Sequence, residues 1–137
     1  MAWHPDLTIS VTQKMEVAGF SGWSVKEGAI HVQAPAAVLE RMLTVRLHLD
    51  DCGPNDGPLR VIPGSHLAGR LDAPQILHWQ RSRASEPCHV PAGGALLMRP
   101  LLLHSSSSAV RPNHRRVIHL EFAEEQLPGG LSWLGEA

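Results

Sequence analysis

Two pairs of side chains in this 137-residue chain could contribute to a metal site: His4 with Asp6, and His48 with Asp50. Residues i and i+2 of an extended strand point to the same side, so each pair can offer an imidazole and a carboxylate to one ion. A distant histidine would complete a set of two histidines and one carboxylate. Such a set leaves coordination positions of iron(II) open for reactants.

Each pair also has a purely structural interpretation. His48 and Asp50 would lie on the polar side of a strand, with the carboxylate capping the turn that follows. His4 and Asp6 would belong to a frayed terminal segment. The residue types and their spacing leave both pairs open as metal ligands.

The most suggestive distant histidine is His104, which follows the apolar run Leu101–Leu103 and precedes four serines. A histidine at the point where a buried strand opens into a polar loop is well placed to bind a ligand at the mouth of a cavity, although a hydrogen-bonded core histidine fits the same pattern. Arg115 and Arg116 begin the next apolar segment. An arginine there could bind a carboxylate through two parallel hydrogen bonds, or form a surface salt bridge.

Short strands must position these residues. The segment Met42–Asp50 alternates, with leucine and valine at 43, 45, 47 and 49 opposite the polar residues Thr44, Arg46 and His48. Further strands are predicted over 59–62, 95–100 and 116–122, and helical turns over 35–41 and 71–83. Several short strands separated by turns favour an antiparallel sandwich or barrel.

Composition excludes several classes of protein. The chain has 12 Lys+Arg against 13 Asp+Glu, a net charge of −1, so it has no basic excess for nucleic-acid binding. Its apolar runs are too short to cross a bilayer, and its two cysteines do not make a disulfide framework. We therefore expect a cytoplasmic protein without a nucleic-acid or membrane partner.

Five stretches of the sequence together resemble the phytanoyl-CoA dioxygenase family. In chain order they are Trp3–Asp6, Leu47–Asp51, Gly57–His66, Leu97–Ser106 and Arg115–Phe122. The resemblance implies a mainly β fold, a double-stranded β-helix or jelly roll with one or two short helices, that binds Fe(II) and 2-oxoglutarate. We expect residues 1–137 to form a single, partial jelly-roll domain of this type.

The resemblance also implies roles for individual residues. His4, Asp6 and His104 match the metal ligands, which leaves His48 and Asp50 the strand-and-turn role. Arg115 matches the arginine that binds the far carboxylate of 2-oxoglutarate. Two further residues match the cofactor site more loosely. Ser106 matches a hydroxyl that assists this arginine, and Trp23 lies near the place of a tryptophan beside the cofactor.

The implied function is that of an Fe(II)- and 2-oxoglutarate-dependent oxygenase that hydroxylates a small or lipid-like organic substrate. An alternative is a catalytically inactive, truncated fragment that acts as a binding or assembly module. A metal-binding cupin of another chemistry would show a His-x-His pair, which this sequence lacks.

Family members are about twice as long, and a sizeable segment precedes their His-x-Asp pair. A sheet that lacks a strand has an unpaired edge, so we expect a homo-oligomer formed by edge pairing or strand exchange. Residues 7–34 and 67–91 are predicted to be covering loops, and His119 and Glu121 receive no role.

Overall fold

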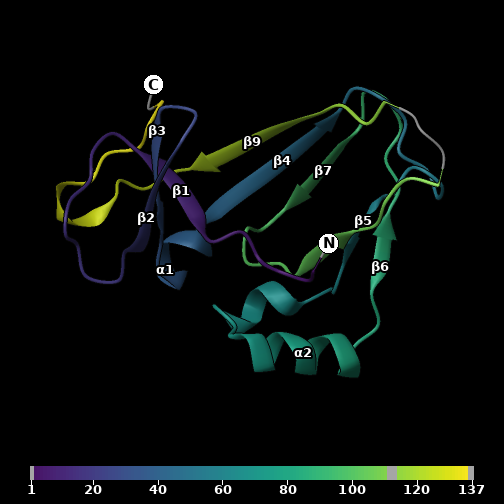
Figure 1. Cartoon of the computed structure of the whole chain (residues 1–137), viewed down its shortest axis with the longest axis horizontal. Helices are drawn as coiled ribbons and strands as arrows, with labels where there is room; N and C mark the ends of the chain where they lie inside the picture. Colours follow the sequence, from purple (N-terminus) through teal and green to yellow (C-terminus); the bar gives the residue numbers. More distant parts are fainter. Residues whose placement is uncertain (1, 111–113, 136–137) are drawn as a thin grey trace.

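The computed structural model describes residues 2–110 and 114–135, and within them it is built mainly of short strands (Figure 1). The strands are β1 (Thr8–Val11), β2 (Ser21–Lys26), β3 (Ala29–Gln33), β4 (Met42–His48), β5 (Leu59–Val61), β6 (Glu86–Cys88), β7 (Ala95–Met98), β8 (His104–Ser106) and β9 (Val117–Ala123). The helices are α1 (Ala36–Leu39) and α2 (Ala73–Ser82), with 3-10 turns at Ser65–Ala68 and Pro128–Gly130. The predicted mainly β fold class is confirmed.

The strands form three antiparallel sheets, ordered β1-β3-β2, β7-β4-β9 and β6-β5-β8. In Figure 1 the β1-β3-β2 sheet lies at one end, while β7, β4 and β9 run above β5 and β6. The hydrophobic core lies against the first sheet: Ile9 and Val11 of β1 and Val32 of β3 pack with residues such as Leu39 and Leu101.

The central strand β4 turns its polar side inward. Thr44 and His48 are 0% and 6% exposed, whereas Leu97 and Phe122, which belong to the other side of the sheet, are 57% and 54% exposed. An antiparallel sheet usually buries its apolar side and leaves its polar side in water. The alternation was therefore predicted correctly, but the burial is the reverse of the common arrangement, and polar groups are directed into the interior.

The prediction that residues 7–34 form a covering loop is wrong, because this segment folds into β1, β2 and β3. Strand β2 is mostly exposed and contains serine, glycine and lysine, so it lacks the apolar alternation that would have revealed it. The second predicted loop, 67–91, contains α2 and β6.

Helix α2 starts at a capping box. The Asp72 carboxylate accepts a hydrogen bond from the Gln75 amide, and the Gln75 side chain accepts one from the Asp72 amide, each at 2.9 Å. This reciprocal pair satisfies amides that the first helical turn leaves unpaired. No helix in the described ranges is long and apolar enough to span a membrane.

Candidate metal centre

Main-chain pairing places His4 and Asp6 beside His104. His4 and His104 form an antiparallel bridge in which each amide donates to the other's carbonyl at 3.1 Å. The Asp6 amide donates to the carbonyl of Pro100 at 2.8 Å. The segment around His4 therefore lies alongside the segment that enters β8, although the two are about a hundred residues apart in the sequence.

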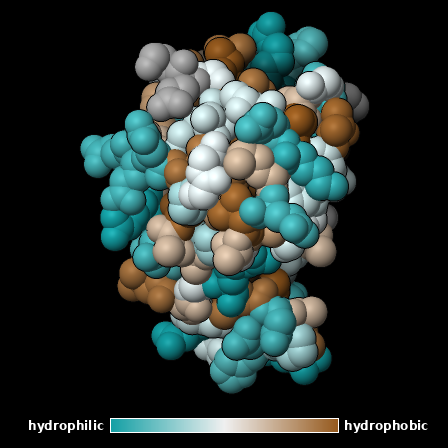
Figure 2. All heavy atoms as spheres, turned by 90° about the vertical axis from the view of Figure 1, so that its left-hand side faces the viewer, coloured by the Kyte–Doolittle hydropathy of each residue, from teal (hydrophilic) through white to brown (hydrophobic). Residues whose placement is uncertain are grey.

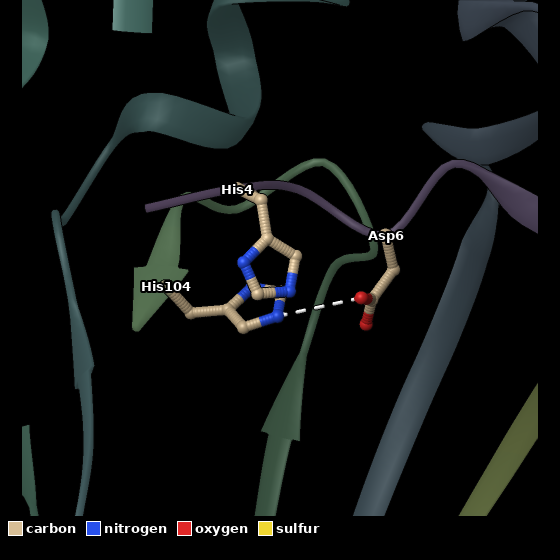
Figure 3. Close-up of side chains that lie close together, drawn as sticks. All are labelled: His4, Asp6 and His104. Carbon is tan, nitrogen blue, oxygen red and sulfur yellow. Dashed lines mark ion pairs between the residues drawn. The ribbon is translucent and has the colours of Figure 1, made fainter. Parts of the chain in front are cut away.

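The three side chains point toward one another (Figure 3). One ligand atom from each of His4, Asp6 and His104 lies within 4.8 Å of the others, and His104 Nε2 is 3.4 Å from Asp6 Oδ1. Ligands of one octahedral ion, each about 2.1 Å from the metal, lie roughly 3 Å from one another. Small side-chain rotations would therefore be enough to close the three groups around one ion.

Hydrogen bonds to main-chain carbonyls determine which imidazole nitrogens are available. Nδ1 of His4 lies 2.8 Å from the carbonyl of Ala2, and Nδ1 of His104 lies 2.8 Å from that of Leu102. A carbonyl can only accept, so each Nδ1 carries the hydrogen, and in the neutral ring the Nε2 lone pair remains for a metal. This is the usual way in which proteins orient a metal-binding histidine.

The electrostatics around Asp6 favour its ionised form. Burial by itself raises the pKa of this carboxyl, but the hydrogen bond and charge of His104, with smaller effects of His119 and His4, bring its pKa below the ordinary value. When Nε2 of His104 carries no hydrogen, its lone pair and the Asp6 carboxylate can bind one cation together, so the donor set fits a metal ion.

A buried serine holds the strand that carries His104. Ser65 is fully buried, and its Oγ accepts a hydrogen bond from the Leu103 amide at 2.9 Å. The Leu103 carbonyl in turn accepts from the Ile62 amide at 3.1 Å. The turn that follows β5 therefore fixes the backbone immediately before the histidine.

A hollow of about 390 Å³ opens beside the cluster. Besides His4 and Asp6, its polar lining includes Lys26, Gln33, His119 and Glu121. A larger hollow of about 890 Å³ shares Lys26, His119 and Glu121 and continues toward the C-terminal segment. Figure 2 shows the end of the molecule that carries the β1-β3-β2 sheet, where hydrophilic and apolar side chains are interspersed.

From the sequence alone, His119 and Glu121 are cavity-wall or surface residues without an assigned role. Their signal was the alternation of β9, which places both on the same side as Arg46 and Thr44 of β4. His119 Nε2 is 3.2 Å from Glu121 Oε1, and the bond to this carboxylate raises the pKa of His119 despite partial burial. The pair gives the hollow a charged wall.

The other residues carried over from the resemblance lie in different surroundings. Arg115 is exposed, and its Nη1 donates to the carbonyls of Asp56 and Gly57 at 3.1 and 3.0 Å. Gly57 has a positive φ of 64°, and a Cβ there would overlap the Ser107 carbonyl and the Arg115 guanidinium. Ser106 is half-buried on β8, two residues beyond His104, and Trp23 packs against the hydrophobic core.

The second candidate pair, His48 and Asp50, has a structural role. Asp50 accepts hydrogen bonds from the Arg116 amide and from two guanidinium nitrogens, at 2.9 to 3.0 Å. These bonds lower the pKa of Asp50 to about 2. His48 is buried on β4, and burial lowers its pKa. Among the described residues the group that could hold a metal is His4, Asp6 and His104.

Comparison with known proteins decides the family. The family model described as "Phytanoyl-CoA dioxygenase (PhyH)" matches residues 2–117, most of the chain. The chain belongs to the phytanoyl-CoA dioxygenase family. Membership supports an oxygenase-type function that uses iron. No curated protein sequence matches closely enough to count as a relative.

Solved structures agree with this assignment. EctD from S. alaskensis in its apoform is 26% identical, with a TM-score of 0.53 over 60% of this chain and 31% of that one. A second crystal structure of the same protein contains bound Fe. AviO1 from Streptomyces viridochromogenes Tue57, at 22% identity and a TM-score of 0.57, covers 91% of this chain and 48% of its own. EvdMO1 is 23% identical, with a TM-score of 0.58, and the match covers 90% of this chain and 23% of EvdMO1.

The chain is therefore similar in fold to jelly-roll oxygenases. It spans about a third of the length of EctD and about half that of AviO1.

Removing one cluster side chain should abolish tight metal binding. We expect His104→Ala and Asp6→Asn to bind Fe(II) or its substitute Co(II) at least about 100-fold more weakly, because two ligands rarely retain such an ion. The measurement is metal content after anaerobic dialysis. His78→Ala, on the exposed face of α2, is the control and should bind as the unaltered protein does. Unchanged metal content in His104→Ala would contradict the assignment.

Proposed function

We propose that this chain is an Fe(II)- and 2-oxoglutarate-dependent oxygenase that hydroxylates a small organic substrate within a single, partial jelly-roll domain. The observation that carries the proposal is the convergence of His4, Asp6 and His104, with their ligand atoms within 4.8 Å of one another. Family membership supports the same chemistry. When bound, iron would activate O₂ as the oxidant; 2-oxoglutarate would be oxidised to succinate and CO₂ with one oxygen atom, and the other would be inserted into a C–H bond of the substrate.

In this proposal the chain's own residues bind and orient the reactants. Two imidazoles and one carboxylate leave about half of an octahedral coordination sphere free for the cosubstrate and oxygen. Arg115, eleven residues after His104, would bind the far carboxylate of 2-oxoglutarate, since a guanidinium offers two parallel donors to a carboxylate. Ser106 would assist it, and Trp23 would act indirectly by packing the sheet that covers one side of the hollow.

The hollow beside the cluster favours a polar substrate over a lipid-like one. Its volume of about 390 Å³ is near the lower end for small-molecule sites. Charged and amide groups from Lys26, Gln33 and Glu121 line it, and these would be left without water if an alkyl chain filled the space. The two free cysteines, Cys52 and Cys88, support a reducing compartment, and we propose the cytoplasm.

Spectroscopy under anaerobic conditions tests the proposed function. Addition of Fe(II) and 2-oxoglutarate should produce the weak visible charge-transfer band of the chelate, and Arg115→Ala should abolish it at the same cosubstrate concentration. Arg81→Ala, at an exposed position of α2, is a matched control and should leave the band unchanged. Absence of a band in the unaltered protein at saturating ligand would contradict the oxygenase and favour the inactive binding module.

The outer side of the β7-β4-β9 sheet supports self-association. Cross-strand partners on this side are apolar throughout: Leu43 with Phe122, Val45 with Leu120 and Leu97, and Leu47 with Ile118 and Ala95. A side without charges can meet a second copy of itself around a two-fold axis without like-charge repulsion.

The exposed area on this side is enough for a weak dimer. Leu49, Leu97, Ile118, Leu120 and Phe122 are between 41% and 57% exposed. With on the order of 200 Å² for each free side chain, two copies would bury roughly 900 Å² in total, near the lower limit for a specific interface. We propose that this sheet side pairs with a second copy.

A charge at the centre of this side should prevent dimer formation. We expect the unaltered chain to dimerise in the micromolar range by sedimentation velocity and Leu120→Glu to remain monomeric. Leu67→Glu, at a position that is 82% exposed in the turn after β5, introduces the same charge elsewhere and should leave the dimer intact. A monomeric unaltered chain at these concentrations would overturn the proposal.

A further inference from the structure

The inner side of β4 carries an arginine whose Nε has no hydrogen-bond partner among the described residues. Arg46 is half-buried, and its Nε is fully buried with no hydrogen-bond partner among the residues that the structure describes. The same holds for the Oγ1 of Thr44, two residues earlier on the same side of the strand. Buried donors in native proteins are nearly always paired, and an unpaired buried charge costs more than any other unpaired group.

Lack of a hydrogen bond is combined with partial burial only at Arg46 among the described arginines. Six others bond through their guanidinium groups to carboxylates, serine or glutamine side chains, or main-chain carbonyls: Arg41, Arg60, Arg70, Arg99, Arg115 and Arg116. Arg81 and Arg83, for which no such bond is found, are exposed at the end of α2. Arg46 is half-buried between the buried Thr44 and His48 on the polar side of the central strand, and it makes no such bond among the described residues. A ligand that supplies an anionic group would satisfy it.

The register of the sheet places Arg46 next to the metal cluster's hollow. Arg46 lies directly opposite His119 on β9, and cross-strand neighbours on one side of a sheet have their Cβ atoms roughly 5 Å apart. His119 lines the hollow together with His4 and Asp6. Burial raises the pKa of the Cys88 thiol on β6, and the charge of Arg46 opposes this rise, so the guanidinium is within electrostatic reach of the opposite sheet.

We propose that Arg46, assisted by the hydroxyl of Thr44, binds a carboxylate of 2-oxoglutarate beside the metal cluster. This inference rests on the proposed function and adds a cosubstrate-binding residue to it. The planar guanidinium can donate two parallel bonds to a carboxylate, and Thr44 can donate a third. The cost of leaving both groups unpaired in the free protein would be offset when the cosubstrate binds.

Direct binding measurements test the inference without any substrate. Titration calorimetry with 2-oxoglutarate on the anaerobic Fe(II) protein should show that Arg46→Gln weakens the affinity by roughly 10- to 100-fold, the usual effect of losing a charged hydrogen bond. Arg46→Lys keeps the positive charge but loses the two parallel N–H donors of the planar guanidinium. Its affinity for 2-oxoglutarate should lie between those of the unaltered protein and Arg46→Gln. Arg41→Gln, which removes an exposed guanidinium paired with Glu125, is the control and should bind as the unaltered protein does.

Thermal stability separates a ligand-binding role from a structural one. Removing a half-buried guanidinium whose Nε is unpaired should leave the melting temperature of the ligand-free protein unchanged or raise it in Arg46→Gln and Arg46→Met. A large fall in melting temperature in both variants, or unchanged 2-oxoglutarate affinity in Arg46→Gln, would overturn the inference. If the unaltered Fe(II) protein bound no 2-oxoglutarate, the proposed function itself would fail.

Discussion

The candidate site depends on one main-chain contact, the antiparallel bridge between His4 and His104. Its two reciprocal hydrogen bonds, each 3.1 Å, bring together two imidazoles that are about a hundred residues apart in the sequence. The same pairing continues to Asp6 through its bond to Pro100. Without this pairing the three side chains would share no common element, because His104 lies on β8 and Asp6 precedes β1.

The turn after β5 stabilises the bridge between His4 and His104 through a hydrogen bond to the backbone next to His104. Ser65 is buried and bonds the amide of Leu103, so the backbone before His104 is held by both a side chain and a neighbouring strand. A hydrogen bond between buried groups is costly to break, since the remaining partner then lacks water. The buried part of the molecule therefore defines the position of His104, and His4 is positioned by its bridge to His104.

The second constraint is the reversed burial of the β7-β4-β9 sheet. Its inner side carries the buried Thr44, the half-buried Arg46, and His119 on the wall of the hollow. Its outer side carries apolar residues such as Leu97 and Phe122. One strand pattern thus provides both a polar wall near the metal cluster and an apolar surface suited to protein contact. The proposed binding of 2-oxoglutarate by Arg46 depends on the inner side of these strands, and the proposed dimer depends on their outer side.

The sequence was informative where local patterns determine structure. The alternation of Met42–Asp50 predicted β4, and the capping residues Asp72 and Gln75 match the start of α2 within the predicted helical segment. The metal-ligand pairing of His4 and Asp6 with His104 required the family resemblance, because spacing alone left His48 and Asp50 as equal candidates.

Other features could not be read from the sequence. Strand β2 is exposed and has no apolar periodicity, so its pairing with β3 depends on tertiary contacts. The alternation of β4 predicted that one side of the strand is apolar and the other polar. It did not predict which side faces the interior, because the packing of the other elements decides that. The unpaired state of Arg46 is likewise a property of the folded interior.

A crystal structure of the chain loaded anaerobically with Fe(II) tests the central claim most directly. Anomalous scattering at the iron edge should locate one ion within about 2.0–2.3 Å of Nε2 of His4, Nε2 of His104 and a carboxylate oxygen of Asp6. An ion bound elsewhere, or these three side chains left without metal at saturating iron, would contradict the account.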